Sequence, residues 1–236
     1  MILVGHQPEY IPWISFFGKL TMADCFMIVD NVQFNKKYFQ NRVRIRNANG
    51  WSWLTVPIIT KNRFYQRINE VVIDSTTNWQ RKHWKTISIA YKKASTYQDH
   101  SGFFEDIFNK NWTMLVDLNV EIIKYLIKAF GIKIEVIKSS DYPEITGSKT
   151  DLIIDMCKAT GAKTYLSGIH GKDYIDEQKV NDSGIKLLYQ EFTHPTYPQI
   201  FHPFIPNMSS VDLLFNCGAE SYSILKESSK YYEFYK

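Results

Sequence analysis

The residues best placed for chemistry follow the first predicted strand. The chain opens MILVGHQPEYIPW, so four apolar residues and a glycine lead directly to His6 and Gln7. Pro8 and Pro12 fix the backbone around the aromatic residues that come next. A catalytic or ligand-orienting group needs this kind of preorganisation. His6 could therefore move protons near neutral pH or donate a hydrogen bond to a developing phosphate charge.

Two later strands also end in polar residues. The second predicted strand, DCFMIVDNVQF, carries Asp30 and Gln33, and KTYLSG ends in Ser167 and Gly168. Ligands of open α/β sheets bind beyond the carboxyl ends of the strands, so these residues predict one site shared with His6. Gly168 would let backbone amides approach a phosphate or carboxylate, and the nearby Lys172 would add positive charge. The alternative is that these strand ends are polar only because they enter loops.

The segment NRVRIRNANGWSW alternates with period two and contains an Asn-Gly turn, which predicts a β-hairpin. Arg42, Arg44 and Arg46 fall on one face of it. Arginine geometry suits a clamp for a diphosphate, and Trp51 and Trp53 could stack on a base or sugar ring. The alternative interpretation is a solvated hairpin face.

A proline- and aromatic-rich segment, HPTYPQIFHPF, begins at His194 and is typical of a shaped pocket wall. It carries Tyr197 and Gln199. His194 and His202 lack the spacing of a metal site, and no carboxylate joins them in a recognisable pattern, so no metal site is predicted.

The composition excludes several classes of protein. Lysine and arginine outnumber acidic residues by 28 to 24, a net charge of +4 that favours an anionic ligand but falls short of a dedicated nucleic-acid binder. Three widely spaced cysteines indicate no disulfide framework. We expect a cytoplasmic protein without membrane insertion, because neither a signal peptide nor a membrane-spanning run is visible. No P-loop, G-x-S-x-G elbow or G-x-G-x-x-G motif is present.

Strands and helices alternate along the chain. Strands are predicted at 2–5, 24–34, 132–137, 163–168 and, as the last strand, 184–192; helices at 13–23, 78–93, 112–130, 150–158 and from a capping box at Ser209 and Asp212 to Gly218. This pattern predicts an α/β fold with a mostly parallel, doubly wound (Rossmann-like) sheet. We expect a single domain over 1–236, with a β-hairpin and a helical segment inserted at about 38–112.

The opening segment also carries a family resemblance. GHQPEYIPWISFF, VDNVQF and QNRVRIRN closely resemble the first conserved block of WbqC-like proteins, and TYLSG, GKDYIDE, HPTYPQ and SSVDLLFNCG resemble later blocks. The likeness covers nearly the whole chain. Ser15 stands where the family typically has glycine, and GIHGKDY departs from the family's more glycine-rich form. The resemblance implies sugar modification in bacterial O-antigen and surface-polysaccharide synthesis, acting on a nucleotide-linked sugar.

A looser, fold-level similarity links the first 34 residues to pantothenate synthetases and related nucleotidyltransferase-like proteins. Those enzymes use ATP to form an acyl adenylate, which an amine then attacks. The second histidine of their H-x-G-H signature is absent, because His6 is followed by Gln7, Pro8 and Glu9. The cofactor is therefore unknown, with ATP and magnesium as one candidate and acetyl-CoA as the next.

The leading hypothesis is an enzyme that acylates or aminoacylates the amino group of a nucleotide-linked sugar. The catalytic candidates are His6, Asp30 and His194. The substrate-binding candidates are Gln7, Tyr10, Trp13, Gln33, Arg42, Arg44, Ser167, Gly168, Lys172, Tyr197 and Gln199. In this hypothesis His6 stabilises or protonates the reacting group, Asp30 and Gln33 orient the nucleophile, the arginines hold a diphosphate, and the 167–172 residues bind the donor.

Two alternatives remain at this point. One is a non-catalytic partner that binds a sugar nucleotide or glycan in a polysaccharide assembly complex. The other is a transferase that takes its acyl group from an aminoacyl-tRNA, which is the one setting in which a nucleic acid is expected. A homodimer is a further candidate state.

Overall fold

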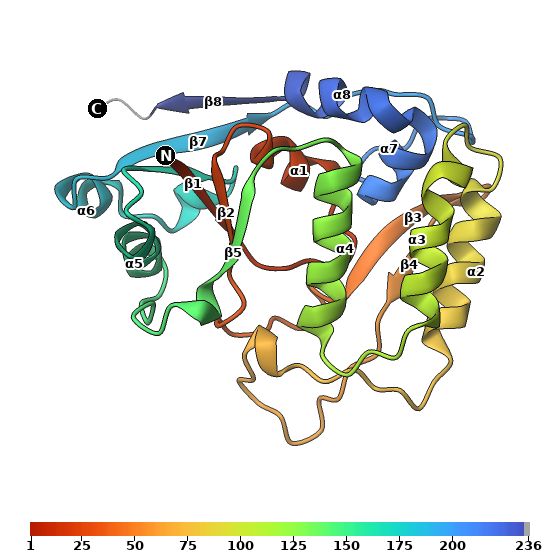
Figure 1. The fold of residues 1–236 in the computed structure, drawn as a ribbon, viewed down its shortest axis with the longest axis horizontal. Coiled ribbons are helices and arrows are strands. Elements are labelled where there is room, and N and C mark those ends of the chain that lie inside the picture. Colours follow the sequence, from red (N-terminus) through yellow and green to blue (C-terminus); the bar gives the residue numbers. More distant parts are fainter. Residues whose placement is uncertain (234–236) are drawn as a thin grey trace.

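The structure, a computed structural model, describes residues 1–233 and is built around a six-stranded sheet (Figure 1). Five strands are parallel, and the edge strand β8 runs antiparallel to β7. Among the parallel strands, order along the sheet reverses between β1 and β6, which is the junction where doubly wound folds bind ligands. This architecture confirms the predicted fold class. The sheet order is β5 (Glu135–Lys138), β2 (Cys25–Ile28), β1 (Ile2–His6), β6 (Thr164–Ser167), β7 (Lys186–Phe192) and β8 (Ser229–Glu233).

Helices cover both faces of the sheet, so the strands are apolar on both sides. Leu3 and Met27 contribute to the core under α5 (Thr150–Thr160) and α6 (Glu177–Asp182). Val4 and Phe26 point the other way, into the core shared with α1 (Ile14–Leu20), α4 (Leu115–Ala129) and α8 (Ser221–Glu227). Figure 1 shows these two layers on opposite sides of the strands. Their burial explains the near-continuous apolar runs in the sequence.

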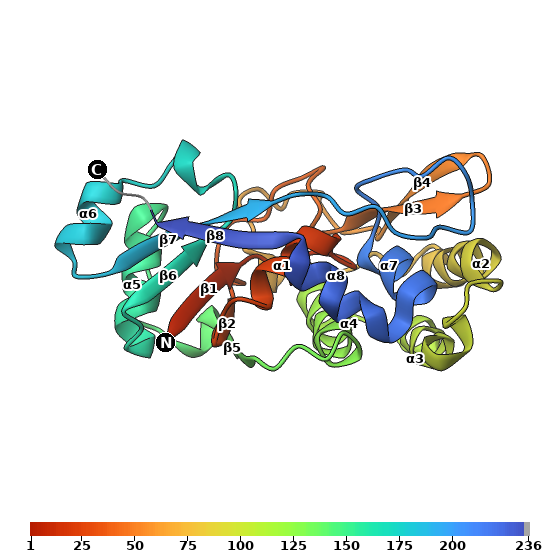
Figure 2. The same cartoon turned by 90° about the horizontal axis from the view of Figure 1, so that it is seen from above.

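The hairpin of β3 (Arg42–Asn47) and β4 (Gly50–Thr55) lies beyond the sheet, beside α2 (Trp79–Tyr91), α3 (Tyr97–Asn109) and α7 (Ser210–Cys217) (Figure 2). Val43 and Ile45 are buried, so one hairpin face packs into the protein. Aromatic side chains of the helices meet beneath it, where Tyr91, Tyr97 and Phe104 surround Phe215. The opposite hairpin face carries the arginines.

Three element predictions were wrong, and one helix was missed. The last strand is β8 rather than 184–192, and α3 was not predicted. The second strand ends at Ile28 instead of continuing to 34, because the Asp30 amide donates to Ser139 Oγ and no longer joins the sheet. At Ser209 the hydroxyl caps α7 by accepting from the Val211 amide, but the Asp212 carboxylate bonds elsewhere and completes no capping box.

Within residues 1–233, no helix combines the length and the apolar character that crossing a membrane requires. The three cysteines are free; Cys25 and Cys157 are buried and Cys217 is partly buried.

Candidate functional site

The carboxyl ends of β1 and β6 form the centre of the candidate site. His6 ends β1, and Gly168 directly follows β6. Backbone pairing between these two strands covers Ile2 with Thr164 and Leu3 with Tyr165, and it does not extend to the carboxyl ends. His6 therefore lies where the strands stop pairing, at the reversal of strand order.

Two charged residues that the sequence analysis did not select lie at the same junction. Lys19 and Glu9 are only 2% and 5% exposed. Lys19 is on α1, and its Nζ lies 3.7 Å from the position that a Cβ on Gly168 would occupy. Among the described residues, no ion pair within 4 Å joins the two charges, and Glu9 Oε2 has no hydrogen-bond partner. The junction therefore holds a buried lysine and a buried carboxyl group, one oxygen of which has no hydrogen-bond partner.

The sequence did contain a signal for both. Lys19 is the one charged residue in the otherwise apolar helix ISFFGKL, and Glu9 comes three positions after His6. A single charge on an apolar helix has a bland interpretation, since long lysine side chains often reach past apolar surface to water. Burial of the ammonium beside Gly168 distinguishes this lysine from that case.

Burial shifts the pKa of all three groups. Desolvation, with the Lys19 charge second, lowers the pKa of His6 to about 3, against a smaller raising effect of the Gln7 carbonyl. Desolvation raises the pKa of Glu9 to about 7, and the Lys19 charge partly offsets it. Desolvation lowers the pKa of Lys19 to about 8, opposed by Glu9. At pH 7, His6 is neutral while Glu9 and Lys19 both titrate near neutrality, as is common at functional sites.

The neutral His6 has a defined tautomer. Its Nδ1 lies 2.9 Å from the Gln7 carbonyl, so Nδ1 carries the proton and Nε2 keeps its lone pair. The imidazole edge packs at 4.8 Å against the Phe16 ring on α1. His6 is thus oriented as a hydrogen-bond acceptor at Nε2.

The segment after His6 is rigidly held. Asn119 of α4 donates to the carbonyls of both Pro8 (3.1 Å) and Gln40 (2.8 Å). Gln40 in turn donates to the Gln7 side chain. Ile11 has a φ of +45°, a strained conformation for a β-branched residue that the surrounding structure must enforce. These contacts fix both the His6 turn and the 35–40 loop beside it.

On one face of the hairpin, arginine guanidinium groups lie against tryptophan rings. The Arg42 guanidinium lies 4.4 Å from the Trp53 ring, and that of Arg44 lies 4.7 Å from Trp51 and 5.1 Å from Trp53. Both Nε atoms are buried without a partner. Phe39 is 6.1 Å from Trp53, so this face is continuous with the loop that contacts Gln7.

Arg46 lies on the same face of β3 as the other two arginines, but its side chain is covered. It is 2% exposed and donates to the carbonyls of Asn47, Gly50 and Pro203. The three arginines therefore share one face as predicted, but the loop containing Pro203 covers the third, so only Arg42 and Arg44 remain partly exposed.

Asp30 and Gln33 follow β2, the strand whose last residue, Ile28, pairs with His6. The Asp30 carboxylate accepts hydrogen bonds from Ser139 Oγ and from the amide and hydroxyl of Ser140, at 2.9–3.1 Å. It thereby ties the end of β2 to the end of β5. Gln33 is exposed and bridges to Arg67 through the backbone.

The residues from the proline-rich segment form an internal network rather than an open wall. Tyr197 and Gln199 both donate to Asp212 Oδ2, at 2.9 and 2.7 Å. His194 Nδ1 donates to the Pro195 carbonyl and Nε2 accepts from the Asn207 amide, so the backbone occupies both ring nitrogens. This network anchors the segment on α7.

The remaining predicted residues are divided between core and surface. Tyr10 is fully buried and its hydroxyl bonds His83, whereas Trp13 packs at 5.4 Å on Phe192. Ser167 is buried under Gly171. The exposed Lys172 places its ammonium 4.8 Å from the Tyr232 ring, on the face of the sheet opposite Lys19.

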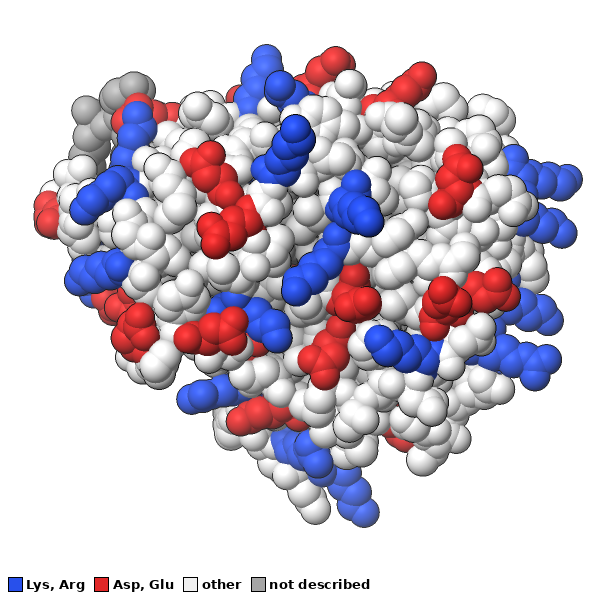
Figure 3. Space-filling view, in the orientation of Figure 1, with Lys and Arg blue, Asp and Glu red and all other residues white. Residues whose placement is uncertain are grey.

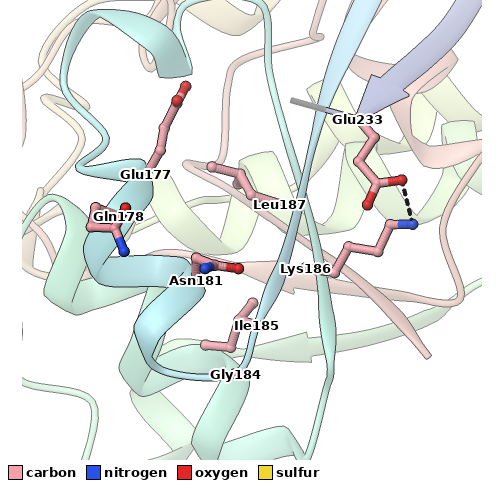
Figure 4. Close-up of a pocket in the computed structure, with 8 residues that line it drawn as sticks. All are labelled: Glu177, Gln178, Asn181, Gly184, Ile185, Lys186, Leu187 and Glu233. Atoms are coloured by element: carbon pink, nitrogen blue, oxygen red, sulfur yellow. Dashed lines mark ion pairs between the residues drawn. The ribbon is translucent and has the colours of Figure 1, made fainter. Parts of the chain in front are cut away.

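Two surface hollows lie away from this edge. One, of about 480 Å³, is bordered by α6 and the first residues of β7, including the Lys186–Glu233 ion pair (Figure 4). The second, of about 310 Å³, is lined by residues at the end of α1 and before β5. Both are at the amino edge of the sheet, opposite His6. Over residues 1–233, no three His, Cys, Asp or Glu side chains gather closely enough to hold a metal ion.

Comparisons with known proteins agree on one relationship. The model of the WbqC-like protein family matches residues 7–224. A Mycobacterium tuberculosis relative (strain ATCC 25618 / H37Rv), described as the uncharacterized protein Rv1507c, is 32% identical over 222 residues, which cover 93% of this chain and 95% of the relative. No solved structure gives a significant match.

Proposed function

Because this chain belongs to the WbqC-like protein family, we propose that it is an enzyme that transfers an acyl or aminoacyl group to the amino group of a nucleotide-linked sugar. The family resemblance supplies the expected setting, the assembly of bacterial surface polysaccharides such as O-antigen. The observation that carries the chemistry is the group of His6, Glu9 and Lys19 at the junction of β1 and β6.

The transfer requires an amine that can attack. The sugar nitrogen forms a bond to the acyl carbonyl carbon, and the bond from that carbon to its leaving group breaks, with the electron pair departing on the leaving group. The amine must also lose a proton. His6 Nε2 accepts a hydrogen bond from the amine and orients it. Glu9, with a pKa of about 7, is matched to receive the proton near neutral pH.

The hairpin face supports a nucleotide-linked acceptor. Guanidinium groups held against indole rings offer N–H donors to phosphate beside flat aromatic surface for a base or sugar. From Trp53 the contacts continue through Phe39 to Gln40, which bonds Gln7 next to His6. A nucleotide on the hairpin would therefore extend its sugar toward the junction.

A product assay tests this proposal. The protein is incubated with UDP- or dTDP-linked amino sugars and with a donor, either glycine with ATP and magnesium or acetyl-CoA, and product mass is recorded. We expect acylated sugar nucleotide from at least one pair. His6→Ala removes the acceptor that orients the amine and should lower turnover on the order of 100-fold, while the exposed His202→Ala serves as a matched control with unchanged turnover. Wild-type turnover in His6→Ala would remove His6 from the reaction.

The same hairpin face favours a second candidate, a non-catalytic protein that binds a sugar nucleotide or glycan. In that case Arg44→Met would abolish binding of the sugar nucleotide, yet no donor would yield a product. An aminoacyl-tRNA is the third donor arm of the assay. On the face shown in Figure 3, acidic side chains are interspersed among basic ones, unlike the basic surface typical of RNA-binding proteins.

A further inference from the structure

The ammonium group of Lys19 lies next to Gly168. If Gly168 carried a Cβ, the one heavy atom within 4 Å of it, apart from its chain neighbours, would be Lys19 Nζ at 3.7 Å. Gly168 itself is partly exposed. The Lys19 side chain on α1 therefore places its ammonium beside the turn that follows β6.

Glu9 is the buried carboxyl group whose charge acts on the Lys19 ammonium, but it forms no ion pair with Lys19. The two charges influence each other, yet among the described residues they form no ion pair within 4 Å. Glu9 Oε2 is also buried without a hydrogen-bond partner. In a buried ion pair at contact distance, each of the two charges would have compensated the other for the loss of water. The arrangement instead leaves the ammonium capable of taking another anion.

We propose that Lys19, beside Gly168, is the oxyanion subsite of the acyl donor and binds its phosphoryl or carboxylate group. The identity of the donor rests on the proposed transfer, whereas the binding itself can be measured without it. Gly168 keeps the approach to the ammonium free of side-chain atoms. His6 and Glu9, the other titratable groups at the junction, place the attacking amine next to this subsite.

The charges at the junction give the subsite a pH dependence. His6 stays neutral above pH 5 and contributes no charge. Below about pH 7, Glu9 becomes protonated and no longer competes with a bound anion for Lys19. Above about pH 8, Lys19 loses its proton. Affinity for an oxyanion is therefore expected to fall as the pH rises from 6.5 to 9.

Isothermal titration calorimetry at pH 6.5 tests the subsite with three probes: inorganic pyrophosphate, ATP and glycine. Lys19→Met removes the charge and keeps the length of the side chain. Gly168→Ala keeps Lys19 but places a methyl group 3.7 Å from its ammonium, an ordinary contact that the fold can accept. The control is Lys163→Met, an exposed lysine just before the opposite end of the same strand.

We expect the wild type to bind at least one probe and both test variants to bind it tenfold or more weakly, while Lys163→Met is unchanged. Binding of pyrophosphate and ATP marks a phosphoryl group, and binding of glycine alone marks a carboxylate. Equal affinity in the wild type and Gly168→Ala, or no binding of any probe to the wild type, overturns the subsite. Should Lys19→Met fail to fold, Gly168→Ala still decides.

The outcomes separate the subsite from the transfer. Lys19-dependent binding without any product in the acyl-transfer assay would leave the subsite standing and refute the transfer. Product formation with an undiminished rate in both Lys19→Met and Gly168→Ala would support the transfer and refute the subsite.

Discussion

At the junction of β1 and β6, burial shifts the pKa values of three side chains toward their neutral forms. Each shift comes mainly from desolvation, so the fold is less stable whenever one of these groups is charged. Apolar residues at the same positions would avoid that cost. A protein that retains such groups at the ligand-binding edge of its sheet is expected to use them.

The pH dependence of stability tests the state of Glu9. Its pKa rises from 4.5 to about 7 on folding, so between these values the native state holds a proton that the unfolded chain has released. Stability conferred by this group is thus present below pH 4.5 and lost as the pH rises to 7. At about 1.4 kcal/mol per pKa unit, the loss is about 3 kcal/mol.

Glu9→Gln removes this titration. In urea unfolding, its free energy of unfolding relative to wild type should therefore increase by about 3 kcal/mol between pH 4.5 and 7. A difference that is constant with pH would mean that Glu9 is not held in the protonated form.

The pH dependence of the reaction tests the same group as proton acceptor. We expect kcat/KM to rise with pH through about 7, as Glu9 ionises, and to fall above about 8, as Lys19 loses its proton. His6 adds no limb above pH 5, because it is already neutral. In Glu9→Gln the rising limb should disappear. If it persists in that variant, the amine of the substrate is responsible instead.

At the residue scale, the sequence predicted part of the site. His6 could be identified because it ends a short apolar strand and is followed by two prolines. The sequence signal for Glu9 and Lys19 was not decisive, because only packing shows that a long charged side chain stays buried. Tyr197 and Gln199 were expected to bind a ligand. The sequence could not show that both side chains donate hydrogen bonds to Asp212 instead.

At the element scale, the placement of α1 depends on close packing against the C-terminal part of the chain. A Cβ on Gly18 would lie 2.2 Å from Ser229 Oγ and 3.3 Å from the Leu225 carbonyl. Glycine at position 18 is therefore required by a close approach between elements, not by a turn.

Two glycine substitutions distinguish packing from helix propensity. Gly18→Ala should destabilise the protein by about 1–3 kcal/mol through overpacking. Gly102→Ala, in the middle of α3 with no atom within 4 Å of the new methyl group, should stabilise it by about 0.5–1 kcal/mol. Urea unfolding measures both. Adding Ser229→Ala to Gly18→Ala should recover part of the loss; no recovery would refute the contact.

Elements with strong local patterns were predicted, and those defined by tertiary contacts were not. The strands β1, β2, β6 and β7 are apolar on both faces, and α4 keeps its helical spacing from end to end. Strand β8 has no such pattern: SKYYE forms a strand because it pairs with β7 at the sheet edge. The burial of Arg46 likewise depends on the distant loop at Pro203.

At the scale of the whole molecule, the doubly wound sheet and the hairpin with its helices lie side by side along the long axis (Figure 2). The 35–40 loop links them, because it contacts Gln7 at the end of β1 and Trp53 on the hairpin. This arrangement places a cationic aromatic surface next to the titratable junction. One elongated ligand could therefore contact both parts.

The most direct test of this account is where an acceptor binds. Backbone amide signals of the isotope-labelled protein are followed by NMR during titration with a UDP- or dTDP-linked amino sugar. We expect the largest shifts at His6, Gln7 and Gly168, with further shifts at Arg44 and Trp53. Shifts confined to the hollow at Gly184–Leu187, at the amino edge of the sheet, or no shifts with any such sugar, would contradict it.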